Sequence, residues 1–161
     1  MPFSFINTVA SWMLKKRIHE IDLFIKYPID VQNDQLKNLI TFAKNTEFGK
    51  KYEFSSIDNY QTFKERVPSF TYEEFFPTIN RTIKGEQNIF WPEKIKWFAQ
   101  SSGTTNSKSK FIPVSNSSLD GCHFKGGKDM LCFYLNNNES AQRFLGKSLR
   151  LGGSRKIYEN N

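Results

Sequence analysis

Apolar residues recur every three or four positions near the start of the chain, which is the spacing of one face of an α-helix. Across residues 4 to 26 this stripe consists of Ile6, Ala10, Leu14, Ile18, Ile21 and Ile25. A second stripe, across residues 33 to 45, consists of Leu36, Leu39, Ile40 and Ala43. The pattern predicts two amphipathic helices that are separated at Pro28 and turn their apolar faces toward a core.

The second helical unit is expected to end at Phe48-Gly49. A shorter, third helix is predicted from the signals at its two ends. A third helix is expected to start after Ser56 and to stop at Val67-Pro68, because a residue that precedes proline is driven out of the helical conformation.

A fourth helix is predicted from a capping box. Thr71 and Glu74 have the required spacing, in which each side chain satisfies a backbone N–H at the start of a helix. Pro77 is expected to interrupt this helix, and Gly85 to close the segment after the proline. Residues 1–90 are therefore expected to form a mainly helical N-terminal region.

The pattern changes at Trp91-Pro92. Short runs that are rich in aromatic and β-branched residues, at 95–99 and 111–114, predict two strands with a polar loop between them. Residues 91–161 are expected to be the start of an α/β domain, so the predicted fold class of the chain is α/β.

One long helix is predicted after the second strand. Ser115 can cap it, and it should reach about Leu135. Gly126 and Gly127 inside a helix would each cost about 1 kcal/mol relative to alanine. We therefore expect either close packing against another backbone at this point or a break in the helix. A last short strand is predicted over residues 148 to 151.

Composition and charge narrow the classes of partner. The chain contains sixteen phenylalanines and 38 % hydrophobic residues, which is enough for a packed core. Its net charge of +7 permits an anionic partner such as a nucleotide, a nucleic acid or a membrane surface. The basic residues are spread along the chain and no RNA-binding or zinc-finger signature occurs, so a phosphate site is favoured and no nucleic-acid partner is expected.

The cysteines and histidines do not indicate a metal or catalytic site. Cys122 and Cys132 lack the spacing of zinc ligands and are expected to be reduced thiols in the core or at the surface. His19 is expected at the surface, and His123 to be a buried or half-buried helix residue rather than a catalytic base. No run is long enough to span a membrane and the N-terminus lacks the features of a signal peptide, so a cytoplasmic protein is expected.

The strongest chemical signal lies in residues 101 to 113, which read SSGTTNSKSKFIP. Gly103 allows the backbone to approach an anion, the surrounding hydroxyls donate hydrogen bonds, and a lysine supplies charge. Each charge-assisted contact contributes roughly 1.5–3 kcal/mol, so four or five could hold a nucleotide. The spacing excludes a Walker loop, because the fifth residue after Gly103 is Lys108 rather than glycine. On composition alone, a Ser/Thr-rich surface turn is the alternative.

The run Ser-Ser-Gly-Thr-Thr, followed by Lys110 and Phe-Ile-Pro, resembles the phosphate loop of the adenylate-forming enzymes. Within that superfamily it is most similar to the auxin-responsive acyl acid amido synthetases. Other segments that resemble the bacterial members of this family are Thr46 to Lys50, Val67-Pro68 with Tyr72, Trp91-Pro92, Trp97 to Ala99, His123, Gly126 to Asp129 and Leu151 to Ser154. The resemblance covers most of the chain after about Leu36. It implies a helical N-terminal region that leads into an adenylate-forming α/β domain.

The resemblance also implies a reaction. Enzymes of this family use ATP and Mg²⁺ to adenylate a carboxylic acid and then transfer the acyl group to the amine of an amino acid. The residues that would wrap the β- and γ-phosphates are Ser101, Ser102, Gly103, Thr104 and Thr105. Lys110 is the expected catalytic residue, because its charge would stabilise the leaving pyrophosphate, and Lys108 is a possible helper. Trp97 and Phe98 are expected to hold the strand that directs the loop.

The family's later elements, including its adenine, ribose and magnesium motifs, are not recognisable after Lys110. We therefore expect a single incomplete domain: an N-terminal part of a longer ligase or a truncated gene product, with little or no adenylation by this chain alone. The alternative is a non-catalytic basic module that binds a nucleotide, a membrane or a protein. Lys15, Lys16 and Arg17 of the first helix would be the basic residues of such a module.

Overall fold

The computed structural model describes residues 2–101, 109–138 and 149 of the protein. Its elements, in chain order, are α1 (Pro2–Lys26), α2 (Pro28–Ala43), α3 (Glu47–Lys51), the 3-10 helix η1 (Phe54–Ser56), α4 (Tyr60–Arg66), α5 (Tyr72–Ile83), β1 (Trp97–Gln100), β2 (Phe111–Val114), α6 (Asn116–Ser118), the π-helical segment η2 (Leu119–Phe124) and α7 (Lys125–Asn137). Within the described ranges, strands follow only after a long helical region, as the sequence predicts. The predicted fold class is confirmed.

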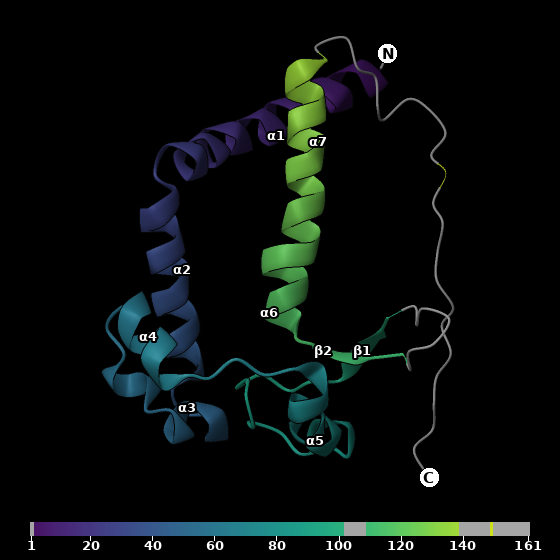
Figure 1. Ribbon diagram of the computed structural model, residues 1–161. Coiled ribbons are helices and arrows are strands. Elements are labelled where there is room, and N and C mark those ends of the chain that lie inside the picture. The colour runs from purple at the N-terminus through teal and green to yellow at the C-terminus, as the bar shows by residue number, and fades with distance from the viewer. Residues whose placement is uncertain (1, 102–108, 139–148, 150–161) are drawn as a thin grey trace.

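The elements are arranged as a frame (Figure 1). α1 lies across one end, and α2 leads from it to the opposite end, where α3, α4, α5 and the sheet lie. The chain then returns along α6, η2 and α7 until α7 packs against α1. The sheet is therefore held between the helical first part of the chain and the returning helix.

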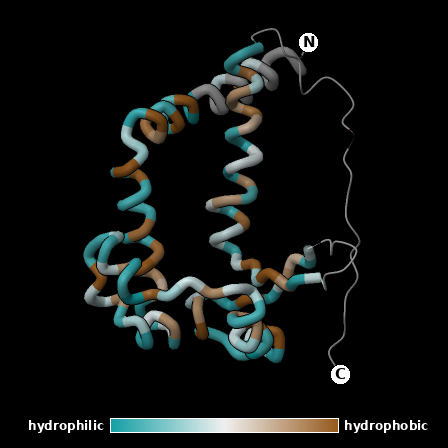
Figure 2. The backbone as a smooth tube through the Cα atoms, in the orientation of Figure 1, coloured by the Kyte–Doolittle hydropathy of each residue, from teal (hydrophilic) through white to brown (hydrophobic). Residues whose placement is uncertain are grey.

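The two long N-terminal helices agree in part with the predicted apolar stripes. Figure 2 shows apolar and polar positions interspersed along α2 and along the coloured part of α1. Ile21 and Ile40 are buried, whereas Ile25 is 71 % exposed. α2 begins at Pro28 rather than near residue 33, because a proline at the first helical position sacrifices no helical hydrogen bond. Pro28 starts the second helix instead of standing apart from it.

The main core lies where α2 meets the short helices. Ile40 and Ala43 of α2 are buried together with Phe54 and Ile57. The partly buried hydrophobic residues that surround this cluster are Leu36, Phe48, Tyr52, Phe63, Val67 and Trp91. Because Trp91 comes shortly before β1, this core anchors the chain that enters the sheet.

A short helix, α3, lies where the sequence predicted only the end of a helical unit. The Thr46 hydroxyl caps α3: it accepts a hydrogen bond from the Gly49 N–H at 2.9 Å and donates one to the Ala43 carbonyl at 2.7 Å. The Phe48 N–H donates to the Ile89 carbonyl at 2.7 Å. The prediction that the unit ends at Phe48-Gly49 is wrong, because Thr46 starts a new turn that contacts the segment before the sheet.

α5 begins where its capping box predicts. The Thr71 N–H and hydroxyl donate to the Glu74 carboxylate at 2.7 and 2.9 Å, and the Glu74 N–H donates to the Thr71 hydroxyl at 3.2 Å. These hydrogen bonds, the Thr71 N–H first, lower the pKa of Glu74. The predicted interruption at Pro77 is wrong: the proline removes one backbone donor, but burial of Ile79 beyond it keeps the helix on the core. Gly85, with φ of 99°, ends the unit as predicted.

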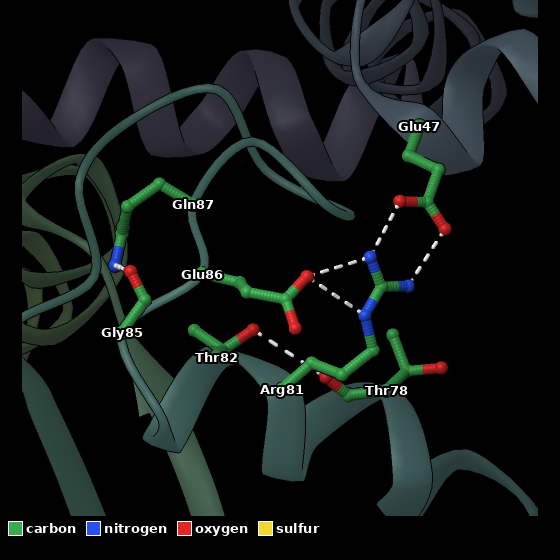
Figure 3. A network of polar contacts seen from close by, with 7 residues as sticks. All are labelled: Glu47, Thr78, Arg81, Thr82, Gly85, Glu86 and Gln87. Atoms are coloured by element: carbon green, nitrogen blue, oxygen red, sulfur yellow. Dashed lines mark hydrogen bonds and ion pairs between the residues drawn. The ribbon is translucent and has the colours of Figure 1, made fainter.

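Arg81 ties α5 to two other segments (Figure 3). Its two terminal nitrogens each donate to a carboxylate oxygen of Glu47 in α3 at 2.8 Å. Its Nε and Nη2 donate to Glu86 at 2.9 and 2.8 Å. The hydrogen bonds from Arg81 lower the pKa of Glu47, and those to Glu47 and then Glu86 raise the pKa of Arg81 still further above the physiological range. This network fixes the direction of α5, whose first turn reaches the sheet.

The last helix begins at Ser115, as predicted. The Ser118 N–H donates to the Ser115 hydroxyl at 3.1 Å, and the Ser115 N–H donates to the Ser118 hydroxyl at 3.2 Å. Gly126 and Gly127 are exposed, and nothing beyond the adjacent backbone of their own helix lies within 4 Å of the position that a Cβ would take, so close packing against another backbone is not their role. The break in the regular helix lies before them, in η2. The predicted strand over 148–151 lies outside the described residues except for position 149.

Arg17 of α1 is partly buried and is paired with acidic side chains rather than standing on a free basic surface. It donates through Nε and Nη2 to the Asp129 carboxylate of α7 at 2.8 and 3.2 Å, and it also pairs with Glu20. The hydrogen bonds from Arg17 lower the pKa of Asp129 despite the opposing effect of burial. In the described part of the chain, no helix has the length and apolar character needed to cross a membrane.

Candidate functional site

Two of the predicted site residues, Ser101 and Lys110, lie in the described part of the chain. The others, which lie outside the described residues, are Ser102, Gly103, Thr104, Thr105 and Lys108. The structure therefore describes the base of the predicted phosphate loop, where the chain leaves β1 and returns to β2.

The base of the loop is closed by hydrogen bonds between its two ends. β1 and β2 pair in antiparallel register from Trp97 opposite Val114 to Gln100 opposite Phe111. One step further, the Ser101 N–H donates to the Lys110 carbonyl at 3.0 Å, and the Lys110 N–H donates to the Ser101 hydroxyl oxygen at 2.9 Å. The Ser101 hydroxyl accepts a hydrogen bond here, so its proton can still be donated to an anion.

Tyr72, the first residue of α5, holds the other edge of β2. Its hydroxyl accepts a hydrogen bond from the Phe111 N–H at 2.8 Å and lies 3.4 Å from the Phe111 carbonyl oxygen. Phe111 directly follows Lys110, so the start of α5 and the end of the loop are joined. The sequence marked Tyr72 as part of the family resemblance but did not link it to this site, because a contact between residues 39 positions apart leaves no local pattern.

The Lys110 ammonium group lies over the first turn of α5. Its Nζ is 4.9 Å from the centre of the Tyr72 ring and 3.6 Å from the Glu73 Oε1. The lysine side chain remains 44 % exposed, so the cation–π contact contributes only about 0.5–1 kcal/mol and the ion pair less than about 1 kcal/mol. Because these contacts are weak, the Lys110 ammonium group can leave them to bind a more highly charged anion at little cost in free energy.

The opposite end of the hairpin is held by Glu93. Its carboxylate accepts a hydrogen bond from the Ser117 N–H at 3.0 Å, at the start of the last helix. The Trp91 indole N–H donates to the Ser117 hydroxyl at 3.2 Å, and the hydroxyls of Ser117 and Ser115 lie 3.0 Å apart. The pKa of Glu93 is lowered, first by the Ser117 N–H and then by these side chains, against the effect of burial. The segment before β1 is thus joined to the segment after β2.

Replacement of Glu93 by glutamine is expected to lower stability at neutral pH by about 0.5–1 kcal/mol, because a negative charge near a helix N-terminus is favourable. The folded-state pKa of Glu93 lies below the ordinary value of 4.5. Its contribution is therefore fully present above that value and is lost as the pH falls through the folded-state pKa. The melting temperatures of the original protein and of Glu93→Gln should differ at neutral pH and converge in acid. Glu65→Gln, at an exposed position of α4, is the control, and parallel profiles for Glu93→Gln and the original protein would contradict this role.

The remaining candidates are distributed away from the base of the loop. His123 is exposed in η2 and packs against Phe124, so the expectation of a buried or half-buried side chain is wrong. Cys132 is buried and Cys122 is exposed, with no disulfide among the described residues, as expected. Trp97 is largely exposed on β1. In the described ranges, no three His, Cys, Asp or Glu side chains gather as metal ligands would.

Comparison with known protein families identifies the chain's relatives. The model of the GH3 family N-terminal domain matches residues 17–156, which is most of the chain. The chain belongs to the GH3 family. The resemblance drawn from the loop and its flanking motifs is thereby confirmed, and the GH3 match extends over both the helical region and the hairpin.

Individual GH3 proteins match a similar part of the chain. Indole-3-acetic acid-amido synthetase GH3.2 of Arabidopsis thaliana is 32 % identical over 106 residues, which are 65 % of this chain and 19 % of that protein. The 4-substituted benzoates-glutamate ligase GH3.12 of the same plant is 30 % identical over 95 residues, 58 % of this chain and 16 % of that protein. This chain therefore spans less than a fifth of the length of either relative.

A solved GH3 structure shares the fold. The GH3.15 acyl acid amido synthetase superposes with a TM-score of 0.67 at 21 % sequence identity, over 76 % of this chain and 22 % of that one. At 21 % identity, this structural similarity supports the arrangement of the helices and the hairpin and nothing about function.

Proposed function

We propose that this chain forms the N-terminal part of an ATP-dependent acyl acid amido synthetase and carries its phosphate loop. The observation that supports this most directly is the closed base of the loop: Ser101 and Lys110 are bonded to each other at the end of a hairpin in a GH3 family chain. By their names, the relatives described above are an indole-3-acetic acid-amido synthetase and a ligase of 4-substituted benzoates and glutamate. Because this chain covers a small part of their length, the proposal concerns the native polypeptide that contains it.

The proposed reaction has two steps. A carboxylate of the acid attacks the α-phosphate of ATP, so that an acyl-adenylate forms and pyrophosphate leaves. The amine of an amino acid then attacks the acyl carbon, giving an amide and AMP. In the first step negative charge grows on the leaving pyrophosphate, and Lys110 with the hydroxyl of Ser101 would stabilise it.

The other loop residues would complete this site. The proposed contacts to the β- and γ-phosphates come from Ser102, Gly103, Thr104 and Thr105, with Lys108 as a further cation. Adenylation of this kind uses Mg²⁺. The described residues contain no cluster of three metal-ligating side chains, so this part of the chain is not proposed as its site. A reaction that consumes ATP would suit a cytoplasmic enzyme.

The proposal is tested by carboxylic-acid-dependent exchange between pyrophosphate and ATP. The native polypeptide should be isolated from its source and its intact mass measured before the assay. Exchange that requires both Mg²⁺ and an acid is the expected result. A native mass of 18.8 kDa, together with no exchange across a panel of indole, benzoic and fatty acids, would contradict the ligase proposal and favour a non-catalytic binding module.

A further inference from the structure

We infer that Tyr72 is a positioning residue for the phosphate site, acting through the backbone of Phe111 and the ammonium group of Lys110. This inference rests on the proposed function, because it assigns a role within the same site. The Tyr72 hydroxyl bonds the Phe111 N–H at 2.8 Å, and the Tyr72 ring lies 4.9 Å from the Lys110 Nζ. One side chain therefore touches both the residue that carries the charge and the residue directly after it.

The direction of the Phe111 backbone explains why a hydroxyl is useful there. Lys110 turns its backbone groups toward Ser101, and in a strand the next residue turns its N–H and carbonyl to the opposite edge. The Phe111 N–H and carbonyl therefore face away from β1. Tyr72 bonds this edge as a further strand would, which restricts the backbone torsions that set the direction of the Lys110 side chain.

The helix itself does not need this hydroxyl. The capping box of Thr71 and Glu74 already satisfies the first turn of α5. Tyr60 occupies the equivalent first position of α4, after the capping residue Asn59, and it is 59 % exposed. A tyrosine at the first position of a helix can therefore remain exposed, as Tyr60 does. The contacts of Tyr72 with the base of the loop are a separate property of that residue.

The ring of Tyr72 and the carboxylate of Glu73 together hold Lys110 before an anion arrives. The ring attracts the ammonium through its face and remains uncharged, whereas Glu73 competes with a bound polyphosphate for the same cation. Displacement of Glu73 by phosphate would leave Lys110 on the Tyr72 ring and still attached to a fixed backbone. Tyr72 thus orients the lysine in both states.

The test is Tyr72→Phe in the native polypeptide, which removes only the hydroxyl and keeps the ring. We expect the rate of ATP–pyrophosphate exchange to fall about threefold to tenfold, while Tyr60→Phe leaves it unchanged. A double-mutant cycle with Lys110→Ala decides whether Tyr72 acts through the lysine. In the Lys110→Ala background, Tyr72→Phe should change the rate by less than about twofold. A full, additive loss in that background would show an independent structural role and overturn the inference.

A second measurement reports on the hydrogen bond directly. Amide hydrogen exchange at Phe111 should become at least about tenfold faster in Tyr72→Phe and remain unchanged in Tyr60→Phe, because the amide would then face solvent. Unchanged protection at Phe111 would overturn the inference whatever the activity. If Lys110→Ala lowers the rate of ATP–pyrophosphate exchange and Tyr72→Phe does not, the inference fails and the proposed function stands. If the native polypeptide shows no ATP–pyrophosphate exchange, both the inference and the proposed function fail.

Discussion

Gly49→Ala is expected to destabilise the folded chain by about 3 kcal/mol, because overpacking against rigid backbone costs this much. A Cβ at position 49 would lie far inside van der Waals contact with the Ala43 carbonyl oxygen, and 2.9 Å from two backbone carbons of Lys44. The same carbonyl oxygen accepts the Thr46 hydroxyl, and that hydroxyl caps Gly49. Relief of the clash must therefore move the turn between α2 and α3 and break its hydrogen bonds.

The measurement is the melting temperature, which should fall by roughly 6–12 °C for a domain of this size. Gly126→Ala is the matched control, because position 126 is also helical but open to solvent. Alanine there should raise stability by about 1 kcal/mol through helix propensity. Two glycines of one chain are thus expected to respond with opposite sign. A Gly49→Ala protein that melts at or above the original temperature would contradict the close backbone approach.

The helix starts that depend on local chemistry could be predicted from the sequence. Thr71 and Ser115 begin helices because their side chains and those three residues later satisfy backbone N–H groups within one turn. Two of the errors arose where a residue can serve either of two structural purposes. Pro28 can separate helices or start one, and Gly49 can end a helix or permit close packing, and only the tertiary neighbours decide between them.

Only part of the candidate site could be predicted from the sequence. The family resemblance of the loop implied roles for Ser101 and Lys110, and the structure brings these two together. Tyr72 and Glu73 could not be assigned by pattern, because they meet Lys110 only after α5 and the hairpin have packed. In the same way, the contact of Arg17 with Asp129 joins residues that are 112 positions apart. Local signals predict elements, whereas side chains that connect elements require the fold.

Lys110→Ala is expected to lower ATP–pyrophosphate exchange by the native polypeptide at least tenfold. The variant removes one charge-assisted contact to the leaving pyrophosphate, which contributes roughly 1.5–3 kcal/mol, and each 1.4 kcal/mol is about a factor of ten in rate. Stability should fall by only about 1 kcal/mol, because the lysine side chain is partly exposed and its contacts to Tyr72 and Glu73 are weak. A large loss of exchange with at most a small fall in melting temperature is the expected combination.

Two further variants show whether the charge itself is responsible. Lys96→Ala removes an exposed lysine next to β1, at the far end of the same hairpin, and it should leave exchange unchanged. Lys110→Arg keeps the charge but replaces a compact ammonium with a planar, larger group, so it should recover only part of the rate. If Lys110→Ala retains full exchange activity, the role of this lysine is wrong. If Lys96→Ala loses as much as Lys110→Ala, the effect reflects the general positive field of a chain with net charge +7 rather than a contact at the base of the loop.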